Sequence, residues 1–397
     1  MTATRKVAFL VQRIGPYHHA RLQALGADQS LAVHAIEFLP GDTVYAWDRV
    51  DRPGAFRRHQ AADGGQVGAI LSQLEPDVIV CAGYSDPEVH RAVGWAMRRE
   101  IPLVVCSDSN YCDEPRTGLR EAFKRLVVSA FDAGLVAGTR AHEYLGSLGL
   151  DASRRFSPWD VVDNEHFLGG AERARSDAAA NRLRLGLPER YFLCVSRFVR
   201  KKNLERLVLA YAAYAGRAGS SAWSLVLSGS GPLEAGLRSA AAAAGLEDRV
   251  VFPGFLQYGD LPACYGLADG FVLASAADQW GLVVNEAMAC GLPVIVSSGC
   301  GCAPDLVRDG ENGFVFDPDD PAALSEALGR VADLEPARRA QMGVHSKELI
   351  ARFTPEAFAA GLKGAMDCAV SRRRRKSLLS RLALRALQGA RKGHRQP

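Results

Sequence analysis

The segment DQWGLVVNEAMACGLP, residues 278–293, decides how this chain folds. Gly281 permits a tight turn, the apolar run after it is typical of a helix, and the Gly-Leu-Pro sequence ends that helix. The apolar residues 294–296 then have the composition of a buried strand. The segment therefore predicts a turn, a helix and a strand in direct succession.

The start of this predicted helix has the chemistry to bind a phosphorylated sugar. Unpaired N–H groups at Gly281, Leu282 and Val283, together with the positive end of the helix dipole, favour a phosphate. Asp278 lies before the helix and Glu286 inside it, so their carboxylates can accept hydrogen bonds from hydroxyl groups. A nucleotide sugar offers both kinds of partner. An ordinary surface Asp and a helix-face Glu are the alternative interpretation.

Strand-like apolar stretches alternate with helical segments along the whole chain. They are residues 7–11, 32–38, 78–82, 103–106 and 133–137, followed by 191–195, 224–227, 250–252, 270–273, 294–296 and 313–316. Such alternation predicts parallel sheets covered by helices on both faces. Because 397 residues exceed what one hydrophobic core usually organises, we expect two Rossmann-like, doubly wound α/β domains facing each other across a cleft.

We expect five parts in the chain. They are an N-terminal domain (1–165), a linker (166–187), a second domain (188–352), a crossover helix (353–370) and a basic tail (371–397). The expected linker carries charged residues and alanines but few bulky apolar side chains.

The composition indicates a globular protein of the cytoplasm. Apolar residues make up 48% and charged residues 23% of the chain, which is ordinary for globular domains, and no run of about 18 apolar residues could span a bilayer. Nine cysteines, mostly in apolar surroundings, fit thiols in a reducing compartment. Cys300 and Cys302 lack the spacing and the second pair that zinc requires, so we expect no metal.

The C-terminal tail is strongly basic. Residues 370–397 hold eight Arg, two Lys and no acid, so a chain of net charge +4 has a body of charge −6. Leucines between Leu378 and Leu387 add an amphipathic pattern. An anionic membrane surface would suit such a helix, and an inert solvated tail is an equal alternative. No aromatic residue is present for base stacking, so we expect no nucleic-acid partner.

The sequence of residues 278–293 resembles the acidic motif of family 4 glycosyltransferases, also called glycosyl transferases group 1. That resemblance implies the GT-B fold and transfer, with retention, from a nucleotide diphosphate sugar to a glycan or lipid-linked acceptor. No metal or other cofactor is implied. In that family two Glu residues separated by seven positions contact the transferred sugar and the donor ribose. Asp278, one methylene shorter, takes the first place, and Glu286 takes the second.

A basic loop after residues 191–195 supplies the expected diphosphate contacts. Arg197 and Lys202 match the spacing of the family's Arg and Lys that bind the donor diphosphate, and a guanidinium fork and an ammonium suit phosphate oxygens. A merely solvated loop is the alternative. By the same resemblance, further donor contacts are expected at Gly254, Phe255 and Ser275.

In the first domain the resemblance implies contacts from Gly15 and Asp108. Gly15 lies in a loop that borders the acceptor and the donor phosphate, and Asp108 stands where many relatives carry a His. Because the donor's own phosphate oxygen is thought to take the acceptor proton, Asp108 is expected to position substrate. His18 and His19 are alternative proton carriers. Nearby residues that could meet an acceptor are Asn110, Arg116 and Lys124.

Two other functions remain open from the sequence. A GT-B sugar-nucleotide epimerase would make product without an acceptor, and a non-catalytic protein would bind the nucleotide sugar without turnover.

Overall fold

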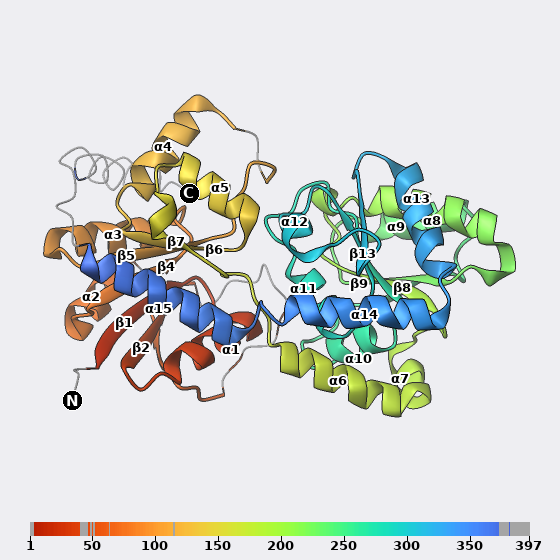
Figure 1. Cartoon of the computed structure of the whole chain (residues 1–397), viewed down its shortest axis with the longest axis horizontal. Helices are drawn as coiled ribbons and strands as arrows, with labels where there is room; N and C mark the ends of the chain where they lie inside the picture. The colour runs from red at the N-terminus through yellow and green to blue at the C-terminus, as the bar shows by residue number, and fades with distance from the viewer. Residues whose placement is uncertain are drawn as a thin grey trace. The chain divides into compact units, whose positions relative to one another are not determined.

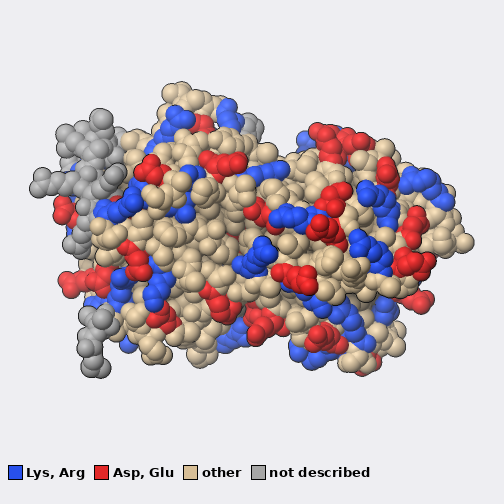
Figure 2. Space-filling view, viewed as in Figure 1, with Lys and Arg blue, Asp and Glu red and all other residues tan. Residues whose placement is uncertain are grey.

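The computed structural model describes residues 4–39, 47, 50, 52–62, 64–113, 116–372 and 381. The chain divides into two compact units (Figure 1). The first comprises Met1–Val161 and Pro355–Pro397, and the second Val162–Thr354. Each unit holds one sheet, so the expectation of two Rossmann-like domains is confirmed. Figure 2 shows acidic and basic side chains interspersed over the visible face of both units.

The first unit is built on a seven-stranded parallel sheet of order β3-β2-β1-β4-β5-β6-β7. Its strands are β1 (Arg5–Val11), β2 (Leu31–Glu37), β3 (Arg57–Gln60), β4 (Val78–Ala82), β5 (Leu103–Ser107), β6 (Ala133–Val136) and β7 (Arg155–Phe156). Its helices are α1 (Pro16–Gly26), α2 (Gly64–Leu74), α3 (Pro87–Arg99), α4 (Gly118–Val128), α5 (Thr139–Ser147) and α15 (Pro355–Ser371), with a 3-10 turn η1 (Ala152–Arg154).

Helix α15 belongs to the first unit although it follows the second unit in the sequence. It packs along α1 and against β6 (Figure 1). Phe358, on α15, is fully buried and its ring lies 5.8 Å from that of Trp159. Gly361 permits the helix backbone to approach closely, because a Cβ there would lie 2.6 Å from the Ser157 carbonyl oxygen.

A buried ion pair fixes α1 against the end of the first unit. The Arg21 guanidinium, 3% exposed, lies 3.2 Å from the Asp160 carboxylate and also donates to the Val161 carbonyl oxygen at 2.9 Å. Its cation stacks 4.5 Å from the Trp159 ring centre. Burial lowers the pKa of Arg21, and the Asp160 carboxylate opposes that shift. A buried charge is tolerated because it is paired and hydrogen-bonded.

The second unit is built on a six-stranded parallel sheet of order β10-β9-β8-β11-β12-β13. Its strands are β8 (Tyr191–Val195), β9 (Ser224–Ser228), β10 (Val250–Gly254), β11 (Gly270–Leu273), β12 (Val294–Ser297) and β13 (Gly313–Phe316). Its helices are α6 (Asn164–Ser176), α7 (Ala178–Leu185), α8 (Leu204–Ala218), α9 (Glu234–Ala243), α10 (Leu261–Gly266), α11 (Leu282–Ala289), α12 (Ala303–Leu306), α13 (Pro321–Ala332) and α14 (Pro336–Ile350), with 3-10 turns η2 (Arg200–Lys202) and η3 (Gly219–Ser221).

The strand order reverses beside β8, which pairs with β9 on one side and with β11 on the other. In doubly wound sheets the connections leave such a position in opposite directions and open a crevice at the carboxyl ends of the strands. The loops that follow β8 and β11 therefore define where this unit is expected to bind a ligand.

Three segments differ from, or fall outside, the interpretation of the sequence. Residues 166–187, expected to be a linker, are largely helical as α6 and α7, and α6 packs on α10 and α11 within the second unit. The short edge strands β3 and β7 were not expected. Apart from residues 371, 372 and 381, the basic tail lies outside the described residues. Within the described ranges, no helix combines the length and apolarity needed to cross a membrane.

Candidate functional site

Lys202 and Asp278 form an ion pair beyond the carboxyl ends of β8 and β11, where the strand order reverses. Lys202 ends η2 in the loop after β8, and Asp278 lies in the loop after β11. The Lys202 Nζ contacts Asp278 Oδ2, and both side chains are about one-eighth exposed. Ser275 donates from Oγ to the same carboxylate oxygen at 3.2 Å. The structure thus brings together three of the residues expected at the site.

The backbone around Asp278 is held by the loop that follows β12. Asp278 N–H donates to the Gly299 carbonyl oxygen at 3.1 Å, and Gly301 N–H donates to the Asp278 carbonyl oxygen at 3.0 Å. Gly299 is needed for this approach, since a Cβ there would overlap the Ala276 carbonyl oxygen. The Ser297 hydroxyl donates to the Ser275 carbonyl oxygen. The position of the Asp278 carboxylate is therefore set by backbone as well as by Lys202.

Arg197 lies in a loop that is hydrogen-bonded to the turn after β9. Ser196 N–H donates to the Ser228 carbonyl oxygen at 3.0 Å, and Phe198 N–H donates to that of Ser230 at 2.8 Å. Gly229 has a φ of 143°, and its Cβ would overlap the Ser196 carbonyl oxygen. Close packing therefore requires glycine in this Gly-Ser-Gly turn, and the turn holds the Arg197 loop at the end of β8.

Helix α11 begins immediately after Gly281, which has a φ of 107°. A Cβ at Gly281 would lie 3.0 Å from Leu273 Cδ2, so this position is both left-handed and crowded. Trp280 is anchored by a 2.9 Å hydrogen bond from its Nε1 to Asn285 Oδ1. Leu282 and Val283, the first two helical residues, are half-buried. The predicted turn and helix start are confirmed, and the role of these amides in phosphate binding stays a prediction.

Glu286 is fully buried, and its Oε2 accepts a 2.6 Å hydrogen bond from the Tyr265 hydroxyl on α10. A ribose hydroxyl reaching this oxygen would have to share or replace that contact. The expected role of Glu286 in holding ribose therefore stays a prediction. The end of β10 carries the expected base contacts: Gly254 has a φ of 83° with open space beside it, and Phe255 is half-buried.

In the first unit, Asp108 and Gly15 follow the carboxyl ends of β5 and β1. Asp108 is half-buried, and its charge acts on the Arg21 guanidinium to oppose the lowering of the Arg21 pKa. Gly15 caps the N-terminus of α1, and no atom of the described residues lies within 4 Å of a Cβ placed there. The described residues therefore leave space beside Gly15.

Both histidines on α1 have a lowered pKa. Burial, and secondarily the nearby Arg21 charge, lowers the pKa of His18 to about 3. Burial and the charges of Arg52 and Arg58 also lower the pKa of His19. A general base works best with a pKa near the operating pH, so a lowered pKa weakens His18 as a base, and the role of both histidines in proton transfer stays a prediction.

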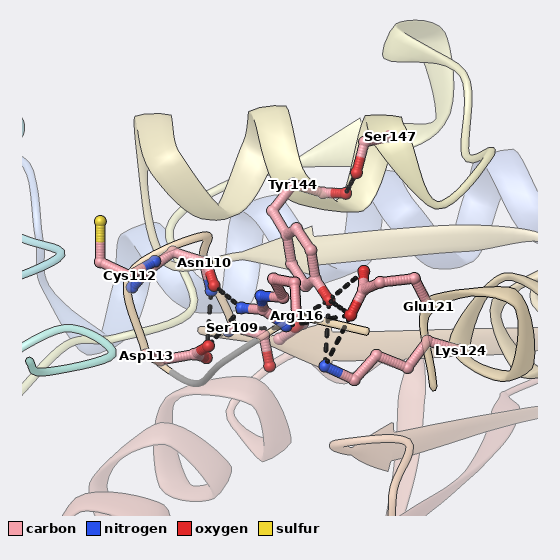
Figure 3. A network of polar contacts seen from close by, with 10 residues as sticks. Ser109, Asn110, Cys112, Asp113, Arg116, Glu121, Lys124, Tyr144 and Ser147 are labelled. Carbon is pink, nitrogen blue, oxygen red and sulfur yellow. Dashed lines mark hydrogen bonds and ion pairs between the residues drawn. The ribbon is translucent and has the colours of Figure 1, made fainter. Parts of the chain in front are cut away.

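Arg116 and Lys124 are bound into a polar network centred on Tyr144 (Figure 3). The Tyr144 hydroxyl accepts from Arg116 Nη1 at 2.6 Å and from Lys124 Nζ at 3.1 Å, and it donates to Glu121 Oε2 at 2.9 Å. Arg116 also donates to the carbonyl oxygen of buried Asn110. These groups order the loop that follows β5, and so they support the backbone that carries Asp108.

The second unit, with the turn, helix and basic loop described above, matches a known family. Residues 177–373 match the family described as Glycosyl transferases group 1. The chain belongs to this family. The matched residues of this group 1 glycosyltransferase include most of the second unit, with the Lys202–Asp278 pair, and helix α15.

Two curated relatives show the extent of sequence similarity. One relative is a GDP-mannose-dependent alpha-(1-6)-phosphatidylinositol monomannoside mannosyltransferase of Mycolicibacterium smegmatis. It is 34% identical to this chain, and the aligned region covers 57% of this chain and 59% of the relative. A D-inositol 3-phosphate glycosyltransferase of Salinispora tropica is 35% identical, over 58% of this chain and 49% of its own. The chain thus spans about half the length of the curated relatives that it matches.

Solved structures resemble a larger share of the chain. Anabaena HepE in complex with UDP and glucose has a TM-score of 0.69 at 17% identity, covering 90% of this chain and 98% of its own. Sucrose-phosphate synthase from Thermosynechococcus elongatus also has a TM-score of 0.69, at 22% identity, covering 90% of this chain and 97% of its own. These likenesses confirm the GT-B fold.

Sequence reasoning did not find the residues that support the site. Tyr265 belongs to no motif, and only its contact with Glu286 reveals it. Ser297 ends β12 and Gly299 lies in the loop after it, next to Cys300 and Cys302, and neither residue belongs to a recognised motif. Among the described residues, no group of three or more His, Cys, Asp or Glu side chains could hold a metal ion.

We expect Gly229→Ala to destabilise the second unit by about 1–3 kcal/mol, because the new Cβ overlaps the Ser196 carbonyl oxygen at a left-handed backbone. Urea unfolding measures this loss. Gly236→Ala is the matched control, since a Cβ there meets open space within α9, and it should be neutral or stabilise by up to about 1 kcal/mol. Equal effects of the two substitutions would contradict the packing role of Gly229.

Proposed function

We propose that this chain transfers a sugar from a nucleotide diphosphate sugar to an acceptor hydroxyl, with retention of configuration and without a bound metal. The observation that carries the proposal is the Lys202–Asp278 ion pair beyond the carboxyl ends of β8 and β11. Arg197 lies in the loop after β8, which backbone hydrogen bonds hold to the turn after β9, and we propose that its side chain supplies a second cation. A cation pair beside a carboxylate suits a diphosphate joined to a sugar.

In the proposed reaction Arg197 and Lys202 stabilise the negative charge that develops on the leaving diphosphate. The bond between the sugar C1 and the diphosphate oxygen breaks, and a bond from C1 to the acceptor oxygen forms on the same face. The acceptor proton passes to a diphosphate oxygen, and the nucleoside diphosphate leaves. Fixed cations of this kind can supply the charge stabilisation that a metal ion gives elsewhere.

Asp278 is proposed to accept a hydrogen bond from a hydroxyl group of the transferred sugar. Its Oδ2 already accepts hydrogen bonds from Lys202 and from Ser275, so the position of the carboxylate is fixed before a sugar binds. The amides of Gly281, Leu282 and Val283 are proposed to hold phosphate or sugar, and Glu286 to hold the ribose. In the first unit, Asp108 and Gly15 are proposed to border the acceptor.

The names of related proteins suggest which substrates to test first. The relative from Mycolicibacterium smegmatis is named for GDP-mannose and phosphatidylinositol monomannoside, and the relative from Salinispora tropica for D-inositol 3-phosphate. The Anabaena structure contains UDP and glucose. We propose UDP-glucose or GDP-mannose as donor class, and a glycan or lipid-linked saccharide as acceptor class.

We expect Asp278→Asn to lower sugar transfer by at least about tenfold, since it removes the charge that orients Lys202 while keeping the side-chain shape. Transfer is followed with labelled donor, in the presence of a chelator, and the product anomer is read by NMR. Glu326→Gln, an exposed change on α13, should have no effect. Wild-type transfer by Asp278→Asn would refute the assigned role, and loss of transfer in chelator would refute metal independence.

The same assay separates the alternative functions. Product formed without acceptor would indicate an epimerase, and donor binding without transfer or hydrolysis over a broad acceptor panel would indicate a non-catalytic binding protein. Neither alternative is favoured by a feature of the described residues.

We further propose that the basic segment 371–397 attaches a cytoplasmic protein to the inner face of an anionic membrane. Its eight Arg and two Lys, without any acid, lie among leucines, and each cation near an anionic leaflet contributes about 1 kcal/mol. A chain truncated after Val370 should sediment less with vesicles that contain phosphatidylglycerol than the full chain does. Equal sedimentation of the two chains would exclude this role for the tail.

A further inference from the structure

A buried hydrogen bond joins Tyr265 on α10 to Glu286 on α11. Both residues are 0% exposed, and the Tyr265 hydroxyl donates to Glu286 Oε2 at 2.6 Å. Taking a carboxylate out of water is costly unless hydrogen bonds compensate for the lost hydration. A hydrogen bond to a charged group stabilises more than one between neutral groups. Tyr265 therefore supplies part of what keeps the Glu286 carboxylate inside the second unit.

The Tyr265 side chain is packed among other buried rings. Its ring centre lies 6.0 Å from that of Phe167 on α6, at 84° between the ring planes, and 5.7 Å from that of Phe271 on β11. Phe167 and Phe271 are themselves fully buried. Close-packed interiors leave a side chain little room to move, so we expect the hydroxyl to keep its place when a ligand approaches Glu286. A ribose hydroxyl would then share the carboxylate with Tyr265 rather than replace it.

Helix α10, which carries Tyr265, lies in close backbone contact with α6. A Cβ at Gly266 would lie 2.7 Å from Ala171 Cα. A Cβ at Gly170 would overlap Pro262 Cβ. Both positions therefore exclude a larger residue, and the two helices have a defined distance from each other.

The guanidinium of Arg175, also on α6, joins the C-terminal ends of α10 and α11. It donates from Nε to the Gly266 carbonyl oxygen at 2.8 Å and from Nη2 to the Cys290 carbonyl oxygen at 2.6 Å. Gly266 directly follows Tyr265, and Cys290 lies one turn after Glu286. The last carbonyl groups of a helix lack partners within it and favour a nearby cation. Arg175 therefore fixes the spacing of the two helices whose side chains meet.

We propose that Tyr265, braced by Arg175, is a positioning residue that makes the nucleotide site selective for ribose over deoxyribose. It holds the Glu286 carboxylate so that this group accepts a hydrogen bond from a ribose hydroxyl. This inference rests on the proposed function, which assigns the ribose to Glu286. A site built to hydrogen-bond a hydroxyl group rejects an analogue without it, because the buried polar group of the site is then left unpaired.

The test is calorimetric titration of the full chain with UDP, GDP and their 2′-deoxy and 3′-deoxy forms. The wild type should bind the nucleotide of its donor at least about tenfold more tightly than one of the deoxy forms. Tyr265→Phe removes only the hydroxyl, so it should weaken binding of the ribonucleotide and leave binding of that deoxy form unchanged. Equal weakening of both forms would indicate a merely structural role and overturn the proposal.

Tyr211→Phe is the matched control. Tyr211, on α8, is also 0% exposed, and its hydroxyl donates to the Trp223 carbonyl oxygen at 2.9 Å. Both substitutions thus remove a buried tyrosine hydroxyl, and Tyr211→Phe should keep the wild-type ratio of the two dissociation constants. The same ratio in Tyr265→Phe and Tyr211→Phe would overturn the proposal.

A second pair of variants decides the outcome if Tyr265→Phe does not fold. Arg175→Lys keeps the charge but loses the fork that joins α10 and α11, so it should also lower the preference for ribose. Arg173→Lys, at an exposed position on α6, should not. Equal preferences in the two lysine variants would overturn the role of Arg175 as a brace.

The wild type separates failure of this inference from failure of the proposed function. A wild-type chain that binds neither UDP nor GDP would contradict the proposed donor site itself. A wild-type chain that binds one of them as tightly as its deoxy forms would retain a diphosphate site and overturn the selectivity proposed here.

Discussion

The ion pair between Lys202 and Asp278 is the interaction on which the candidate site depends. It joins the loops after β8 and β11, the two neighbouring strands at which the sheet order reverses. Because Asp278 also accepts from Ser275 and is bridged through its backbone to Gly299 and Gly301, the carboxylate is held in place before any ligand arrives. A diphosphate that binds Lys202 would share an ammonium already oriented by this carboxylate, which is how preorganised charge lowers a reaction barrier.

Close backbone approaches determine where these charges lie. Gly229 brings the turn after β9 against Ser196, and Gly299 brings the loop after β12 against Ala276. Each contact leaves no room for a Cβ, so the short loops at the carboxyl ends of β8, β9, β11 and β12 pack on one another rather than extend into solvent. The first unit has a different arrangement: its polar groups are tied to each other, as around Tyr144 (Figure 3).

The sequence predicts buried parts of this fold better than exposed ones. Apolar runs give the exact bounds of β4, β8 and β11, since strands buried on both faces are continuously apolar. The edge strand β3 reads Arg-Arg-His-Gln and has no fully buried side chain, so it carries no such signal. Helix α7 has no buried residue either, which explains why its segment was interpreted as a linker. Motif spacing paired Arg197 with Lys202, but contacts between distant segments, such as Tyr265 with Glu286, follow only from the fold.

The central claim is that the crevice beside β8 binds a nucleoside diphosphate through Arg197 and Lys202. Thermal unfolding with UDP and with GDP tests it most directly, because a ligand at a hundred times its dissociation constant stabilises the folded state by about 2.7 kcal/mol. The account predicts a rise in melting temperature with one of the two nucleotides, kept in Arg200→Gln, an exposed neighbour in the same loop, and lost in Arg197→Gln. A rise that persists in Arg197→Gln, or no rise with either nucleotide, would contradict it.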